Sequence, residues 1–106
     1  MTESREPRQR LDKWLWFARI VKSRTLAAKL VAEGYVRVNA VRIENPAKPV
    51  GRGDVLTIGL QREVKVLHIL ANAERRGPYS EARLLYIDLN EIQRGNEPSD
   101  EAPQGS

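Results

Sequence analysis

The spacing of apolar side chains changes once along this chain, at Gly34, and this change restricts the possible folds more than any other feature. Before Gly34, apolar residues recur at intervals of three, four and seven positions, which is typical of amphipathic helices. After it, Val36 and Val38 alternate with polar residues, which indicates half-buried strands. The sequence therefore predicts a helical first third followed by short strands and turns.

The helical third divides into two short helices at a tight corner formed by Lys22 and Ser23. Residues 10–21 contain no Gly or Pro and predict the first helix. Its buried stripe is expected to consist of Leu11, Trp14, Leu15, Ala18 and Val21.

Residues 24–33 predict the second helix, with Ser23 as the N-cap that accepts from an unpaired backbone N–H. Gly34 supplies the left-handed residue that commonly ends a helix. The side chains that this helix is expected to bury are Leu26, Ala27, Leu30 and Val31.

The remainder predicts short strands separated by turns. Asn39 and Ala40 form a turn between strands, and two prolines exclude residues 45–49 from a central strand, so they are expected to be a loop. Ser80 is a candidate cap for a short helical or irregular segment that reaches Leu85. The predicted strands are residues 36–38, 41–43, 55–58 and 63–70, with a last edge contact at residues 86–87.

The two ends of the chain are polar. Residues 1–9 are expected to be a flexible arm, and residues 90–106 a disordered acidic tail. The chain of 106 residues has room for one core, and it has no cysteine, which suits a reducing compartment. No secretory signal or membrane-spanning stretch is evident, so we expect a cytoplasmic protein without a membrane partner.

Charge is distributed unevenly along the sequence. Residues 10–87 carry fifteen Lys and Arg against seven Asp and Glu, whereas residues 88–106 carry only Arg94 against five acids. A basic body with an acidic tail is typical of a protein that binds a polyanion. The alternative is that these charges are scattered for solubility.

Residues that catalysis or metal binding requires are scarce. His68 is the single histidine and lies in a predicted strand, where a structural role is favoured over that of a general base. Gly51 and Gly53 lead into a strand, so they form no phosphate-binding loop at a helix start. With one His and no Cys, a metal site is not supported either. We therefore expect no enzyme, no metal ligands and no cofactor.

Polyanion binding is better supported, because basic side chains concentrate on the predicted helix pair. Ser23 and Thr25 add hydroxyl groups beside the free N–H groups at the start of the second helix. Tyr35 and Arg37 extend the same surface, and Trp16 is either stacked on a base or packed in the core. The basic candidates are Arg10, Lys13, Arg19, Lys22, Arg24 and Lys29. The alternative for them is a solvated helix face.

Two other functions fit parts of this pattern. Two short helices with a tight corner are also typical of DNA-binding helix-turn-helix proteins, although the second helix offers few Asn or Gln for reading bases. The chain could also be an RNA-binding accessory to a separate RNA-modifying enzyme, since it has no residues left for a catalytic domain of its own.

Five sequence blocks in order resemble the S4 RNA-binding domain family. These blocks are RLDKWL at 10–15, KSRT at 22–25, AKLV at 28–31, GYVRVN at 34–39 and PVGRGD at 49–54. A closer resemblance, to the ribosome-associated heat shock protein 15 family, rests on RLDKWLWFAR at 10–19, ERRGP at 74–78, SEA at 80–82 and LY at 85–86.

The resemblance implies an α+β fold, in which the two helices form an αL-type RNA-binding motif that packs on a small, mostly antiparallel sheet. Residues 10–70 would be the S4-type domain and residues 71–89 its C-terminal extension. The implied partner is ribosomal RNA or tRNA on the large ribosomal subunit, in rescue or quality control of stalled nascent-chain complexes. The contacts carried over by position are Arg10, Lys13, Arg19, Ser23, Arg24, Thr25, Lys29, Arg37 and Asn39.

The chain departs from the family pattern at two places. Ala40 replaces a usual Gly, which leaves the turn type open because Ala resists positive φ. The acidic tail stands where the relatives have a long basic extension.

Overall fold

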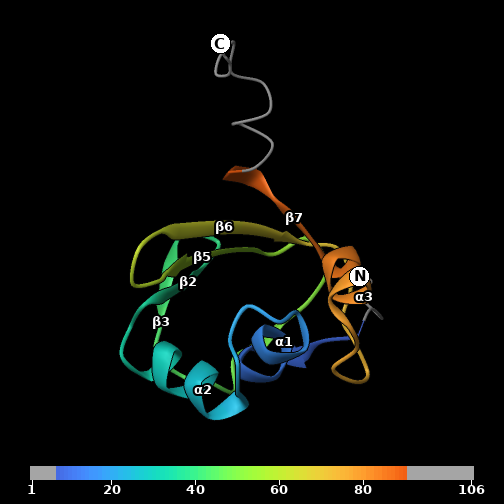
Figure 1. Cartoon of the computed structure of the whole chain (residues 1–106). Coiled ribbons are helices and arrows are strands. Elements are labelled where there is room, and N and C mark those ends of the chain that lie inside the picture. Colours follow the sequence, from blue (N-terminus) through green and yellow to red (C-terminus); the bar gives the residue numbers. More distant parts are fainter. Residues whose placement is uncertain (1–6, 91–106) are drawn as a thin grey trace, which may run out of the picture.

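The computed structural model describes residues 7–90 (Figure 1). Its helices are α1 (Leu11–Phe17), α2 (Arg24–Ala32) and α3 (Tyr79–Ala82), which continues into the 3-10 turn η1 (Arg83–Leu85). Its strands are β1 (Gln9–Arg10), β2 (Val36–Val38), β3 (Val41–Ile43), β4 (Pro49–Val50), β5 (Val55–Gly59), β6 (Val64–Ile69) and β7 (Tyr86–Asp88).

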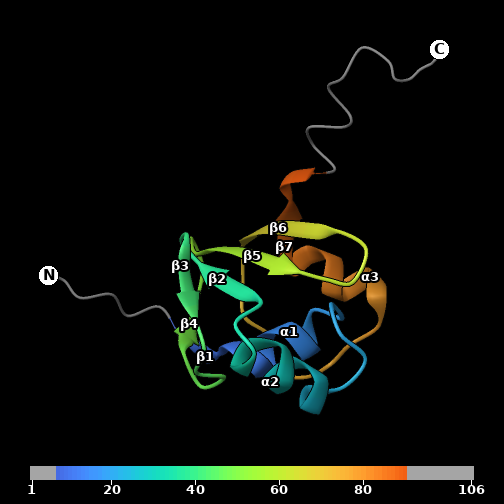
Figure 2. The same cartoon turned by 90° about the vertical axis from the view of Figure 1, so that its left-hand side faces the viewer.

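Within residues 7–90, five strands form one antiparallel sheet in the order β3-β2-β5-β6-β7, and β1 pairs separately with β4. Val38, Leu56 and Leu67 lie side by side across β2, β5 and β6. Figures 1 and 2 show α1 and α2 together on one face of this sheet. The predicted α+β fold with a mostly antiparallel sheet is confirmed.

The hydrophobic core lies between that face of the sheet and α1. Trp14 and Leu15 are fully buried, as are Leu56 and Leu67. The Trp14 Nε1–H donates to the carbonyl of Ala71 at 3.0 Å, which satisfies the indole N–H inside the core. α1 is therefore held both by the sheet and by the chain that follows β6.

The first helix is shorter than predicted. α1 ends at Phe17, because Arg19 adopts a left-handed conformation with φ of 62°. The N–H of Arg19 donates to the Trp16 carbonyl, and the N–H of Ile20 donates to the Leu15 carbonyl, both at 3.1 Å. These bonds form a Schellman motif, which normally has Gly at the position of Arg19. Apolar spacing continues to Val21, but the helix does not.

The second helix begins at Arg24, as predicted, and ends at Ala32, one residue before the predicted end. Ser23 Oγ accepts from the Leu26 N–H at 3.1 Å, and Gly34 follows the helix with φ of 87°. Ala27 and Val31 are fully buried, but the prediction for Leu26 is wrong, since it is 48% exposed. Neighbouring helical residues point about 100° apart, so Leu26 lies beside the face centred on Ala27 and Val31.

The strands at residues 36–38 and 41–43 have the predicted bounds. The turn that joins them has positive φ at both central residues, 52° at Asn39 and 72° at Ala40. This is typical of a type I′ hairpin turn. Ala40 therefore adopts the strained conformation that a Gly would adopt freely.

The predictions for Pro49 and Ser80 are wrong, and those for the two ends of the chain fall partly outside the described residues. Pro49 was expected in a loop but belongs to β4. This strand pairs with β1 alone, in a sheet of two strands. Ser80 lies inside α3, whose N-cap is Pro78, so the predicted cap is wrong. Of the predicted flexible arm, Gln9 lies in β1, while residues 1–6 and the acidic tail beyond residue 90 lie outside the described residues.

Candidate nucleic-acid interface

A buried carboxylate joins the starts of α1 and α2. Asp12 is 3% exposed and accepts two hydrogen bonds from Arg10, at 3.1 Å from Nε and 3.0 Å from an Nη. Arg24 Nε lies 3.6 Å from the same carboxylate, so both arginines flank Asp12. Hydrogen bonding to Asp12, and then its negative charge, raise the pKa of Arg10 above its ordinary value.

Both guanidinium groups remain open to solvent on their far side. The side chain of Arg10 is 50% exposed and that of Arg24 is 42% exposed. A guanidinium carries five N–H donors, so neither arginine spends all of them on Asp12. The arrangement therefore fixes the direction of two cations and leaves donors for phosphate oxygens.

The start of α2 adds further polar groups beside Arg24. Lys22 and Thr25 are exposed next to the Ser23 cap, and Lys29 is exposed one turn after Thr25. Residues four positions apart share a helix face, so Thr25 and Lys29 present a hydroxyl and an ammonium group on the same side. The N-terminal end of α2 also favours an anion through its backbone dipoles.

Lys13 and Trp16 of α1 are half-buried and packed against aromatic rings. Lys13 Nζ lies 5.9 Å from the centre of the Phe17 ring, and Trp16 stacks on Phe17 with ring centres 5.5 Å apart. The guanidinium of Arg76 lies 5.7 Å from the Trp16 ring. Trp16 therefore packs against Phe17 and Arg76 outside the hydrophobic core and stays partly exposed, so its stacking on a base remains a prediction.

The corner between the helices is tied to the segment that precedes α3. Arg19 Nε donates to the Gly77 carbonyl at 2.6 Å. Arg76 donates in return to the carbonyls of Trp16, at 3.0 Å, and Val21, at 3.3 Å. The guanidinium of Arg19 is thus directed toward the Gly77 loop. Sequence spacing did not identify Arg76, and the ERRGP block was its only signal.

The residues predicted on and around β2 do not all join this surface. Tyr35 is 54% exposed, while Arg37 lies between the buried Val36 and Val38 and so points to the face of the sheet away from the helices. The Asn39 amide donates to Asp54 at 3.1 Å and accepts from the Val55 N–H at 2.9 Å. Both of these Asn39 bonds hold the β2–β3 turn against β5.

A hollow near Asn39 is lined by basic residues that the sequence pattern did not single out. Arg8 and Lys48 line it together with Asn39 and Asp54, and its volume is about 400 Å³. Arg8 pairs with Asp54 at 3.3 Å. Pairing of β1 with β4 places Arg10 opposite Pro49, next to Lys48, which extends the basic surface beyond the helix pair.

Other kinds of site find little support in the described part of the chain. Between residues 7 and 90, no three His, Cys, Asp or Glu side chains gather as a metal site would require. His68 is half-buried in β6, opposite Val55 and Ile87. Among the helices of residues 7–90, none has the length and apolar character needed to cross a membrane.

Comparison with known proteins agrees with this geometry. The S4 domain family model matches residues 9–56. Heat shock protein 15 of Escherichia coli K12 is 40% identical over 82 residues, which are 77% of this chain and 61% of that protein. A heat shock protein 15 homolog of Haemophilus influenzae is 38% identical over 81 residues, 76% of this chain and 61% of that homolog. The match thus spans less than two thirds of these curated relatives.

A solved structure covers more of both chains. The trimeric structure of Vibrio cholerae heat shock protein 15 aligns with a TM-score of 0.74 at 33% identity, over 85% of this chain and 94% of that chain. The alignment therefore extends well beyond the segment that the S4 domain model matches.

Proposed function

Since the chain belongs to the heat shock protein 15 family and carries its S4 RNA-binding domain, we propose that it binds structured RNA through the starts of α1 and α2. The observation that carries this proposal is the pair of arginines oriented by the buried Asp12 carboxylate. Further contacts come from the exposed start of α2. The proposed RNA-binding residues are Arg10, Lys13, Lys22, Ser23, Arg24, Thr25 and Lys29, with Arg19, Tyr35 and Asn39 at the margins. Arg37, which points to the opposite face of the sheet, lies apart from this surface.

The proposed target is ribosomal RNA or tRNA on the large ribosomal subunit, in rescue or quality control of stalled nascent-chain complexes. Family membership supports this target, and so does the basic surface. In this role the protein is a cytoplasmic binding module without catalysis of its own. Residues 10–70 are proposed as the binding domain and residues 71–89 as an extension of it.

Recognition is proposed to depend on RNA shape and on phosphate groups. Side chains cannot easily reach base edges in the deep major groove of an RNA helix, whereas Arg and Lys pair readily with phosphates. If five or six cations meet phosphates, the logarithm of the affinity should fall with the logarithm of salt concentration with a slope of about −4 to −5.

The decisive experiment reverses charge on α2. Arg24→Glu combined with Lys29→Glu should abolish co-sedimentation with large ribosomal subunits, because two phosphate contacts become repulsive. Lys29 is exposed, so Lys29→Glu alone should leave the circular dichroism melt nearly unchanged, whereas Arg24→Glu places a carboxylate beside the buried Asp12 and should lower the melting temperature. Sucrose gradients at two salt concentrations measure the first effect.

A matched control makes the same reversal from a positive to a negative side chain at a position outside the two helices. Arg62 is exposed in the turn between β5 and β6 and belongs to neither helix, so Arg62→Glu should bind nearly as the parent does, unlike Lys29→Glu. Equal losses of ribosome binding in the two variants would mean that only the net charge of the protein matters. That result would contradict a defined binding surface. Competition by duplex DNA as strong as by structured RNA would favour the helix-turn-helix alternative.

A further inference from the structure

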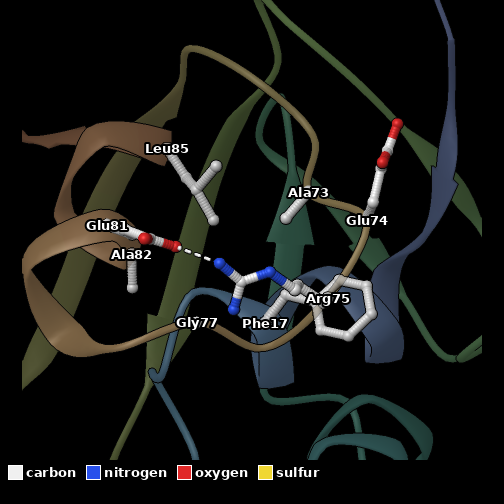
Figure 3. Close-up of a pocket in the computed structure, with 8 residues that line it drawn as sticks. All are labelled: Phe17, Ala73, Glu74, Arg75, Gly77, Glu81, Ala82 and Leu85. Atoms are coloured by element: carbon white, nitrogen blue, oxygen red, sulfur yellow. Dashed lines mark hydrogen bonds and ion pairs between the residues drawn. The ribbon is translucent and has the colours of Figure 1, made fainter.

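A hollow of about 370 Å³ lies between the end of α1 and the α3–η1 segment (Figure 3). It is large enough for a small organic group, and all but one of its residues lie outside the segment that the S4 domain model matches. The residues that line it are Phe17, Ala73, Glu74, Arg75, Gly77, Glu81, Ala82 and Leu85.

The walls of this hollow combine apolar and charged groups. Phe17, Ala82 and Leu85 supply apolar surface from three different elements. Figure 3 shows the Arg75 side chain extending across from Phe17 toward Glu81, to which it donates at 3.1 Å. Both partners are well exposed, 69% and 56% of their side chains, so the ion pair contributes little to stability and a ligand can replace it.

Gly77 keeps this arrangement possible. It is buried, and a Cβ at this position would collide with the Glu81 carboxylate. Glu81 therefore rests directly against the Gly77 backbone, with its carboxylate at the edge of the hollow. Because the Gly77 carbonyl also accepts from Arg19, the same loop contacts the corner between α1 and α2.

The hollow is continuous with the proposed RNA surface. Phe17 lies in its wall, and Lys13 of the same helix lies above the Phe17 ring. Glu74 and Glu81 disfavour a phosphate inside the hollow, but their oxygens suit a ligand rich in N–H donors. An unpaired nucleobase has such donors on its edge and an apolar face that can lie against Leu85, which is half-buried in the wall of the hollow.

We propose that this hollow receives one unpaired guanine of the bound RNA, an inference that rests on the proposed function. The two oxygens of Glu81 accept from the guanine N1–H and N2–H, which lie on the same edge of the base. Arg75, released from Glu81, pairs with a neighbouring phosphate. Of the common bases, guanine is the one with two adjacent N–H donors that match a carboxylate in this way.

The test uses the full chain and RNA hairpins that differ at a single bulged nucleotide. A bulged guanine should bind about tenfold more tightly than a bulged inosine, which lacks the N2 amino group, and more tightly than an abasic bulge. Glu81→Gln should remove the preference for guanine over inosine. Glu63→Gln is the matched control, because Glu63 is exposed, with a lysine 3.9 Å away, and lies far along the chain from the hollow.

A second measurement does not depend on where a hairpin places its bulge. Titration with guanosine monophosphate, followed by two-dimensional NMR, should shift the Gly77 amide and the Leu85 methyl signals more than adenosine monophosphate does. Glu81→Gln should weaken this response about tenfold. Melting curves of the variants establish that the fold is retained.

The outcomes separate the two proposals. Equal binding of guanine, inosine and abasic bulges, with no shifts at Gly77 or Leu85, overturns the guanine site while Lys29→Glu still weakens RNA binding. Loss of the Lys29→Glu effect as well would overturn the proposed function itself. Shifts caused equally by an arginine-containing peptide would assign the hollow to a protein partner and also overturn the guanine site.

Discussion

The helices α1 and α2 are both short and amphipathic but occupy very different environments. Five of the seven residues of α1 are buried, whereas only Ala27 and Val31 of the nine residues of α2 are. α1 is packed against the sheet, against α2 and against the segment after β6, through Trp14 and Ala71. α2 has a free outer face. The difference indicates that α1 mainly stabilises the fold beneath the candidate interface, while α2 contributes most of its exposed side chains.

The two helices also differ in how they end. Both close with the same pair of backbone hydrogen bonds, but α2 uses Gly34 at the left-handed position and α1 uses Arg19. A left-handed conformation costs a non-glycine residue about 1–2 kcal/mol. At Arg19 this cost is offset by the hydrogen bond to Gly77, which ties the end of α1 to a remote loop.

The largest predicted effect separates the two helices by stability. Trp14→Ala should lower the free energy of unfolding by about 3–5 kcal/mol, because a fully buried indole is removed. Leu26→Ala on α2 should cost less than about 1 kcal/mol, since its side chain is 48% exposed. Urea unfolding curves measure both values. Similar losses at the two positions would contradict the division between a buried and a presenting helix.

A smaller effect is expected at the carboxylate that links the helices. Asp12→Asn should lower the free energy of unfolding by about 1–3 kcal/mol, because charge-assisted hydrogen bonds to Arg10 are lost. RNA affinity should also fall, although the net charge of the protein becomes more positive. Fluorescence anisotropy with a labelled RNA hairpin tests this sign. A gain in affinity would mean that Asp12 merely repels RNA and does not orient the arginines.

The smallest effects concern the helix ends. Gly34→Ala should cost about 1–2 kcal/mol, because the residue is left-handed and the new Cβ would collide with the Arg42 guanidinium. Arg19→Gly should change stability by less than about 1 kcal/mol, since relief of strain compensates for the lost bond to Gly77. Thermal melts compare the two variants. A large fall in the melting temperature of Arg19→Gly would show that the hydrogen bond to Gly77 stabilises the end of α1 more than the left-handed conformation strains it.

Features that local chemistry determines were predictable from sequence. Ser23 and Gly34 delimit α2 because capping depends on one residue type at one position. Alternation at residues 36–38 predicted β2, since one face of that strand is buried. Lys22 and Lys29 lie on an exposed face, as expected, because a solvated charge needs no partner.

Features that depend on distant contacts were not predictable. The end of α1 is decided by Arg19, whose partner Gly77 is 58 positions away. No local pattern shows that Asp12 is buried, or that its carboxylate lies between Arg10 and Arg24. β1 and β4 have two residues each, too few to show any alternation.

The dependence of Trp14 on Ala71 and Tyr86 has a consequence during synthesis. α1 is made first, but Ala71 follows Trp14 by 57 residues, and Tyr86 is added only after some seventy. At typical rates of translation this takes about 4–14 s. Throughout that interval the newly made helix has a large apolar side chain without its final cover, so folding from the N-terminus cannot be completed step by step. The packing around Trp14 is completed only when β7 has been made.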